Sequence, residues 1–133
     1  MPRSAEDVES FLLELNRTFD RTDDMFIVST GAEGTPIAIQ VADPVVVVRV
    51  NIGAVPDDAA HQLPLFRKLL ELNGSDLVHA SYAVTGHDEI ILSAGLELES
   101  LDKNELEAVM SDIDIALARH VSTLWEVVHA DLG

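Results

Sequence analysis

The spacing at which apolar residues recur changes repeatedly along the chain, and the resulting order of segments limits the fold. Near the N-terminus, Val8, Phe11, Leu12, Leu15 and Phe19 recur at helical spacing and predict an amphipathic helix over residues 5–20. From residue 25 onward a period of two begins, as in strands. Helical spacing then returns, alternation resumes, and a third helical stretch ends the chain. The sequence thus predicts helix, three strands, helix, two strands and helix, in that order.

The alternating segments are joined by short connections. The five segments are residues 25–30, 37–41, 45–52, 78–84 and 90–98. A glycine-bounded loop at residues 31–34 and a tight turn at residues 85–88 each predict a hairpin. The connections within the first three strands are too short for the crossover that parallel strands need, so we expect an antiparallel meander.

Alternation leaves one face of each strand continuously apolar. An antiparallel sheet of this kind buries one face and leaves the other to solvent. We therefore predict an α+β fold, one domain over residues 1–133, with an antiparallel sheet of about five strands and helices mainly on one face, in the order α-β-β-β-α-β-β-α. The expected core residues are Val46, Val48, Val50, Tyr82, Leu92, Leu96, Phe11 and Leu15.

The two later helices each have an unusual feature. Residues 56–58 mark the start of the second helix and residues 73–74 its end. Pro64 lies between them and predicts either a kink near Leu63 or a fresh start at the proline. Neither proline nor glycine interrupts residues 103–129, and at 1.5 Å per residue this last helix would run about 40 Å. We expect part of it to overhang the sheet or to pack on a partner.

Charge and cysteine content exclude several classes of function. The chain has 24 acidic and 8 basic residues, a formal net charge of −16, so we expect no nucleic-acid partner and no binding to anionic membrane surfaces. Without cysteine it has no disulfide and no thiolate metal site. Residues 1–10 lack the apolar region of a signal peptide, and no apolar run approaches the roughly 20 residues that span a bilayer. We expect a cytoplasmic protein without membrane insertion.

No grouping of residues predicts catalysis. His79 and His87, with Asp88 or Glu89, form the one conceivable metal site, and we interpret them as solvent-facing residues. His120 borders the apolar stripe of the last helix and is interpreted as a packing residue rather than a catalytic base. The glycines match no phosphate-binding loop, and no serine lies in a nucleophile elbow. We therefore predict no enzymatic activity, no metal and no cofactor.

Arg49 is unusual because it lies in a strand built almost entirely of valines. Val45 and Val47 share its face, and an isolated cation there needs solvent or a carboxylate. One interpretation is an outer-face arginine that pairs with an acid on a neighbouring strand. The other is that Val45, Val47 and Arg49 line a partner-binding surface. Trp125, the single tryptophan, is interpreted as either an anchor of the C-terminal packing or an interface residue.

The order of elements resembles that of type III secretion chaperones of the Tir chaperone type and of YbjN-like proteins. Residues 69–73 (LLELN), 80–84 (ASYAV), 90–92 (IIL) and 98–102 (LESLD) carry the resemblance at the level of sequence. It implies a homodimer that binds extended segments of partner proteins through apolar grooves and sheet surfaces, without ATP and without catalysis. The alternative is a small-molecule-binding stress or signalling regulator of the YbjN-like type.

A homodimer is also expected from the amount of apolar surface on the two later helices. A five-stranded sheet does not readily cover all of it, and a large uncovered apolar patch usually marks an interaction site. The candidate interface is therefore Leu65, Leu69 and Leu72 on the second helix, or Leu117, Val121, Leu124 and Val128 on the third. The resemblance favours the second helix and the excess length favours the third.

Overall fold

The computed structural model describes residues 4–29 and 35–130 of the chain. Within these residues it has three helices and six strands: α1 (Ala5–Glu14), β1 (Phe19–Thr22), β2 (Met25–Val28), β3 (Ile37–Ala42), β4 (Val45–Ala54), α2 (Ala59–Ser75), β5 (Ser81–Val84), β6 (Glu89–Glu97) and α3 (Lys103–Val128). The predicted α+β class is confirmed. The order differs from the expectation by one additional strand, β1.

The first helix is shorter than its apolar pattern predicted. It begins after Ser4, whose backbone N–H donates to the Asp7 carboxylate at 2.7 Å, and it ends at Glu14. Asn16 adopts a left-handed φ of 58°, a conformation that asparagine tolerates after a helix. The prediction of a helix to residue 20 is therefore wrong, because Phe19 pairs with Val28 in the sheet instead.

The additional strand forms a hairpin with β2. Thr22 and Met25 are paired across a two-residue turn in which Asp23 has a φ of 54°. Phe19 lies edge-on against Phe26, with ring centroids 5.8 Å apart. Phe19 belongs to a helical stripe by spacing, yet in the structure it is half-buried in the sheet and contacts Phe26 on β2.

All strand pairs in the described sheet are antiparallel, in the order β1-β2-β3-β4-β6-β5. The predicted meander is thus confirmed, while the predicted loop at residues 31–34 lies outside the described residues. The central strands β4 and β6 pair along most of their lengths, with a register shift between Asn51 and Gly53.

The core lies between the sheet and the helices. Val46, Val48, Val50, Tyr82 and Leu92 are buried as predicted. The other three expected core residues, Phe11, Leu15 and Leu96, are only partly buried and pack at its margin. On α1 the fully buried positions are Val8 and Leu12. The sequence therefore identified the helical stripe correctly, but the stripe is centred on Val8 and Leu12 instead of Phe11 and Leu15.

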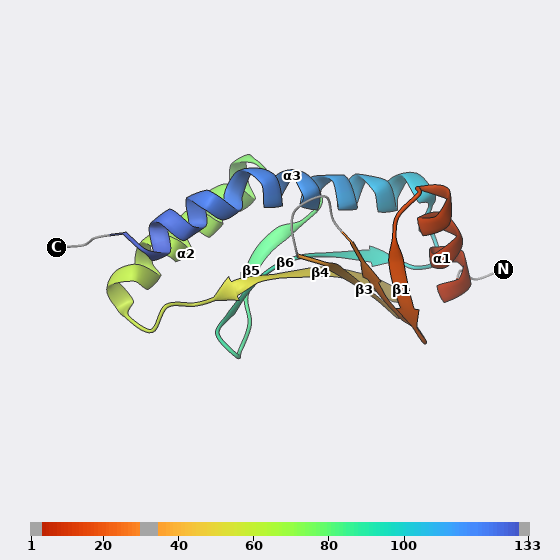
Figure 1. Ribbon diagram of the computed structural model, residues 1–133, viewed down its shortest axis with the longest axis horizontal. Helices are drawn as coiled ribbons and strands as arrows, with labels where there is room; N and C mark the ends of the chain where they lie inside the picture. Colours follow the sequence, from red (N-terminus) through yellow and green to blue (C-terminus); the bar gives the residue numbers. More distant parts are fainter. Residues whose placement is uncertain (1–3, 30–34, 131–133) are drawn as a thin grey trace.

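All three described helices lie on one side of the sheet. Figure 1 shows α3 running along this side, with α2 beside its C-terminal half and α1 near its N-terminal end. The Asp102 carboxylate accepts the Glu105 N–H at 2.7 Å and begins α3. Lys103 lies 3.7 Å from Glu14, which joins the start of α3 to the end of α1.

Helix α2 excludes one of the two alternatives at Pro64 and corrects the predicted end of the helix. A single helix spans Pro64 and continues past Asn73 and Gly74, so neither a new start at the proline nor an end at residues 73–74 occurs. Its start is confirmed, because the Asp58 carboxylate accepts the His61 N–H at 3.1 Å. Three buried leucines on one side anchor α2 in the core, and this packing outweighs the hydrogen bond that proline removes.

Strand β5 begins later than the strand predicted over residues 78–84. Val78 is exposed, and β5 contains only residues 81–84. The Asp112 carboxylate accepts the backbone N–H groups of Val78, His79 and Ala80 at 3.3, 2.9 and 2.9 Å. These bonds hold residues 78–80 against α3 and keep them out of the sheet.

Candidate partner-binding surface

No described helix covers the face of the sheet opposite α1, α2 and α3 (Figure 1). Val45, Val47 and Arg49 lie on this outer face, because Val46, Val48 and Val50 alternate with them and are buried under the helices. Arg49 and Val45 are exposed and Val47 is half-buried. The structure therefore places the three predicted residues side by side on one open face.

Arg49 has no carboxylate partner among the described residues. Its neighbours in the strand register are Ala38 on β3 and Ser93 on β6. The interpretation that Arg49 pairs with an acid on an adjacent strand is therefore wrong, since both adjacent positions carry small uncharged side chains. Its guanidinium is available to an acceptor from outside this part of the chain.

Two further apolar residues on the outer face were not singled out from the sequence. Met25 and Ile27 on β2 lie in register with Gln40 and Ala38 of β3, which in turn pair with Val47 and Arg49. Ile27 is exposed and Met25 is half-buried. Their alternation with buried Phe26 and Val28 was the available signal. The strand register was needed to place them in one row with β4.

The outer face ends at a free strand edge. In the described sheet β1 pairs only with β2. Thr22 and Met25 close the hairpin turn, and Ser29 donates to the Thr18 carbonyl at 2.9 Å. Because hydrogen-bonded and non-bonded pairs alternate in antiparallel strands, the backbone groups of Phe19 and Arg21 point away from β2. This edge can accept another extended chain.

Arg21 also holds the edge strand against α1. Its guanidinium contacts Glu9 at 2.5 Å and Glu6 at 3.1 Å, and it lies 5.3 Å from the centre of the Phe26 ring. Hydrogen bonds to these two glutamates raise the pKa of Arg21, while a backbone hydrogen bond is the main reason that the pKa of Glu6 is lowered. The side chain of Arg21 thus faces the helices while its backbone faces outward.

The residues predicted for a dimer interface are mostly covered by the chain itself. Leu65, Leu69, Leu72, Leu117 and Leu124 are buried, and Val121 and Val128 are half-buried. The exposed leucines of α2 are instead Leu63, at 75% of its surface, and Leu70, at 70%. Together with Phe66 and Val84, Leu70 lines an apolar groove of about 340 Å³ between α2 and β5.

A buried polar cluster joins α2, β5 and α3. The Tyr82 hydroxyl lies 2.8 Å from Nδ1 of His120, and Nε2 of His120 lies 3.1 Å from the Asp76 carboxylate. Burial raises the pKa of Tyr82, and bonds from Ser75 and then His120 lower the pKa of Asp76. His120 is buried, in agreement with its interpretation as a packing residue. Its two ring contacts were not predicted, because their partners are 38 and 44 residues away.

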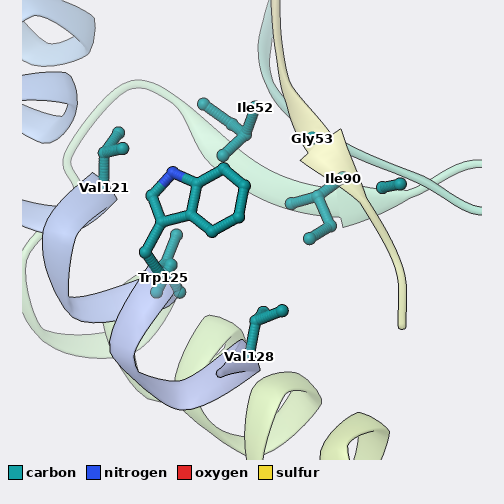
Figure 2. Close-up of a pocket in the computed structure, with 8 residues that line it drawn as sticks. Ile52, Gly53, Ile90, Val121, Trp125 and Val128 are labelled. Carbon is teal, nitrogen blue, oxygen red and sulfur yellow. The ribbon is translucent and has the colours of Figure 1, made fainter. Parts of the chain in front are cut away.

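Trp125 lies over a small pocket at the end of α3. Figure 2 shows its indole pointing from α3 toward Ile52 and Ile90. The indole also stacks on the His129 ring, with ring centroids 4.8 Å apart. The side chain is 53% exposed. The pocket has a volume of about 30 Å³, which is far below the roughly 300 Å³ at which small-molecule sites begin. Trp125 thus packs at the end of the core with half of its side chain exposed, and its two interpretations both stay predictions.

Residues 4–29 and 35–130 contain neither a candidate metal site nor a membrane-spanning helix. No cluster of three or more histidine, aspartate or glutamate side chains there could hold a metal ion. In the same part of the chain, no helix combines the length and apolar character that a membrane span requires.

Comparisons with known proteins identify relatives. The family model CesT_Tir_1 matches residues 1–130, whereas no curated protein matches. Similar solved structures include the heterodimeric ExoU–SpcU complex from the type III secretion system of Pseudomonas aeruginosa (19% identity, 86% of this chain, 95% of that chain, TM-score 0.69). The Yersinia pestis type III secretion chaperone SycH, in complex with a stable fragment of YscM2, is also similar (14% identity, 90% of this chain, 98% of that chain, TM-score 0.60). YbjN of E. coli, described as a putative transcription regulator, is similar as well (13% identity, 96% of this chain, 90% of that chain, TM-score 0.61).

Proposed function

Because this chain belongs to the CesT_Tir_1 family of type III secretion chaperones, we propose that it is a non-catalytic, cytoplasmic protein that binds an extended segment of a partner protein. The observation that carries the proposal is the free edge of β1 beside an uncovered, partly apolar face. An extended segment can pair with such an edge through its main chain, while its side chains occupy the adjoining face. The similarity to SycH, solved with a bound protein fragment, supports this choice.

The outer face supplies the side-chain contacts in this proposal. Ile27 lies beside the edge strand, and the row continues through Ala38 to Arg49. Val45 and Val47 extend the apolar surface along β4. Apolar side chains of the partner would cover Ile27, Val45 and Val47, and an acceptor group of the partner would bind Arg49.

The net charge of −16 favours a basic partner segment. Opposite charge speeds the encounter of two proteins, and this effect weakens as salt screens the charges. Arg49, the one arginine that the described residues place on the outer face, would then select an acidic residue within an otherwise basic segment.

We further propose that the protein is a homodimer through the exposed side of α2. Leu70 and Phe66 face the apolar groove beside β5, and Leu63 continues the exposed apolar surface on α2. These residues replace Leu65 and Leu72, which are buried, as the side chains that a second copy would contact. Leu69 is also buried, but it lines the groove. The proposal keeps the second helix, but it uses the exposed residues beside the predicted leucines.

A pair of variants at one residue tests partner binding at the β1 edge. The Arg21 N–H points away from β2, so Arg21→Pro removes a donor from the free edge without removing a bond of the sheet. Arg21→Ala is the matched control, because it loses the same ion pairs to Glu6 and Glu9 but keeps the N–H. Tagged wild-type protein and both variants would be purified from the native host, and the co-purifying proteins would be quantified.

We expect the partner to be recovered with Arg21→Ala and to be reduced at least about tenfold with Arg21→Pro, the loss that roughly 1.4 kcal/mol of main-chain bonding represents. Circular dichroism confirms that both variants fold. Equal recovery with the two variants, or no protein enriched with the wild type, would contradict the proposal.

A further inference from the structure

The other edge of the sheet differs from the β1 edge, because a side chain already occupies it. In the last turns of α2, the side-chain amide of Asn73 contacts the backbone of Tyr82 twice. Its Oδ1 accepts the Tyr82 N–H at 2.6 Å, and its Nδ2 donates to the Tyr82 carbonyl at 3.1 Å. This pair of bonds reproduces the donor and acceptor that a neighbouring strand would present.

The bonds of Asn73 fall on the side of β5 that faces away from β6. Tyr82 pairs in register with Leu92, and Ser81 and Ala83 pair with Ser93 and Ile91. Since both polar backbone groups of Tyr82 are directed to Asn73, the bonds from β5 to β6 come from the residues on either side of it. Tyr82 is therefore the middle residue of the free edge.

A second side chain occupies the approach to this edge. The Ala80 N–H, two residues before Tyr82, is held by the Asp112 carboxylate at 2.9 Å. Within the four residues of β5, only Val84 then remains with outward-facing backbone groups to offer. A single residue cannot align an added strand, because pairing requires several consecutive bonds.

We propose that Asn73 closes the β5 edge to strand addition and so directs an extended partner segment to the β1 edge. Unpaired edges invite pairing with other chains, and covering them is a known way to prevent it. Here the side-chain amide of Asn73, on α2, covers the β5 edge. The same helix leaves Leu70 exposed, so that another chain can still contact it through side chains. The β1 half of this inference rests on the proposed function, whereas the closure of β5 does not.

Amide hydrogen exchange on the full-length protein tests the closure directly. In Asn73→Ala we expect the Tyr82 amide to exchange at least about fivefold faster than in the wild type, because it loses its acceptor. The Val48 amide, in the central strand β4, reports whether the fold is intact and is expected to be unchanged. Asn104→Ala, which removes an exposed amide from α3, is the matched control. Equal Tyr82 exchange in wild type and Asn73→Ala would overturn the proposal.

A spin-labelled peptide then locates strand addition. The probe is a synthetic peptide of eight residues that alternates valine and threonine, with a lysine at each end to match the acidic protein and a nitroxide label. The two edges of a six-stranded sheet lie about 24 Å apart, so broadening of backbone amide signals distinguishes them. In the wild type we expect broadening at Phe19 and Arg21 and none at Tyr82 and Val84. In Asn73→Ala we expect broadening at Tyr82 and Val84 as well.

The outcomes separate the two proposals. Broadening at β5 that is equal in wild type and Asn73→Ala, whether strong or absent, would overturn the closure by Asn73. Absence of broadening at β1 in the wild type would contradict partner binding at that edge. The comparison at β5 would still decide the role of Asn73.

Discussion

The hydroxyl of Tyr82 lies 2.8 Å from Nδ1 of His120, within the layer between β5 and α3. Asp76 is bonded to Nε2 of the same ring, and as a carboxylate it can only accept. Nε2 must therefore carry a proton, and in the neutral ring Nδ1 accepts the Tyr82 proton. Every polar atom of the buried imidazole has a partner, so the cluster ties together α2, β5 and α3.

Tyr82→Phe tests the contribution of this cluster to stability. The ring is kept, but Nδ1 of His120 loses its donor in a buried position. We expect the free energy of unfolding to fall by about 1–2 kcal/mol, measured by urea denaturation. The slope of the transition serves as the control for an unchanged fold. An unchanged midpoint would show that water replaces the hydroxyl at no cost.

His61 makes the contact between the start of α2 and the end of α3 dependent on pH. Its ring bonds the Ala130 carbonyl and the Asp58 carboxylate, and these contacts, in that order, raise the pKa of His61 above 6.5. A raised pKa in the folded state stabilises the fold fully below about pH 6.5, the unfolded value. That contribution is lost as the pH rises through the folded pKa. We expect wild type to exceed His61→Gln in stability at pH 6 and the difference to shrink by pH 8.5.

The pKa of Asp58 adds an acidic limit to the same contact. The His61 side chain is the main cause that lowers the pKa of Asp58, so the contribution of Asp58 is lost as the pH falls through that lowered value. The His61 titration can be followed by NMR in the wild type and in Asp58→Asn. A His61 pKa at or below 6.5 in the wild type would contradict this account.

Leu70→Asp tests the proposed dimer. Leu70 is exposed, so a carboxylate there costs little in a monomer but is buried without a partner in a dimer formed through α2. We expect light scattering at micromolar concentration to give a dimer for wild type and a monomer for Leu70→Asp. Leu13→Asp, at an exposed position on α1, is the matched control and is expected to remain dimeric. A wild-type monomer at both low and high salt would contradict the dimer itself.

Pro64→Ala is expected to stabilise the protein. Pro64 is exposed within α2, and alanine restores a backbone N–H that the helix can use. The gain is expected to be about 1–3 kcal/mol in urea denaturation, up to the difference in helix propensity between the two residues. Pro56→Ala, before the helix, is the control and should change stability much less. A loss of stability in Pro64→Ala would indicate that the proline contributes to packing or to a smaller unfolded ensemble.

The sequence predicted the parts of the candidate site that depend on alternation within one strand. Val45, Val47 and Arg49 were placed on the open face correctly, because residues two apart share a face whatever the strand pairs with. It did not predict Met25 and Ile27 as their neighbours, since the register across β2, β3 and β4 depends on three separate segments. The interface leucines show the same limit: helical spacing finds an apolar stripe without showing what covers it.

By itself, the sequence determined most of the order of helices and strands, the inward face of β4 and the long uninterrupted helix α3. These features depend on contacts between residues a few positions apart, and such contacts leave periodic or short local patterns. Only the tertiary structure decided that Phe19 joins the sheet, that β1 is left as a free edge, and that Asn73 covers the opposite edge at Tyr82. In each case the deciding contacts reach another element, so the same local sequence would fit more than one arrangement until the sheet and helices pack.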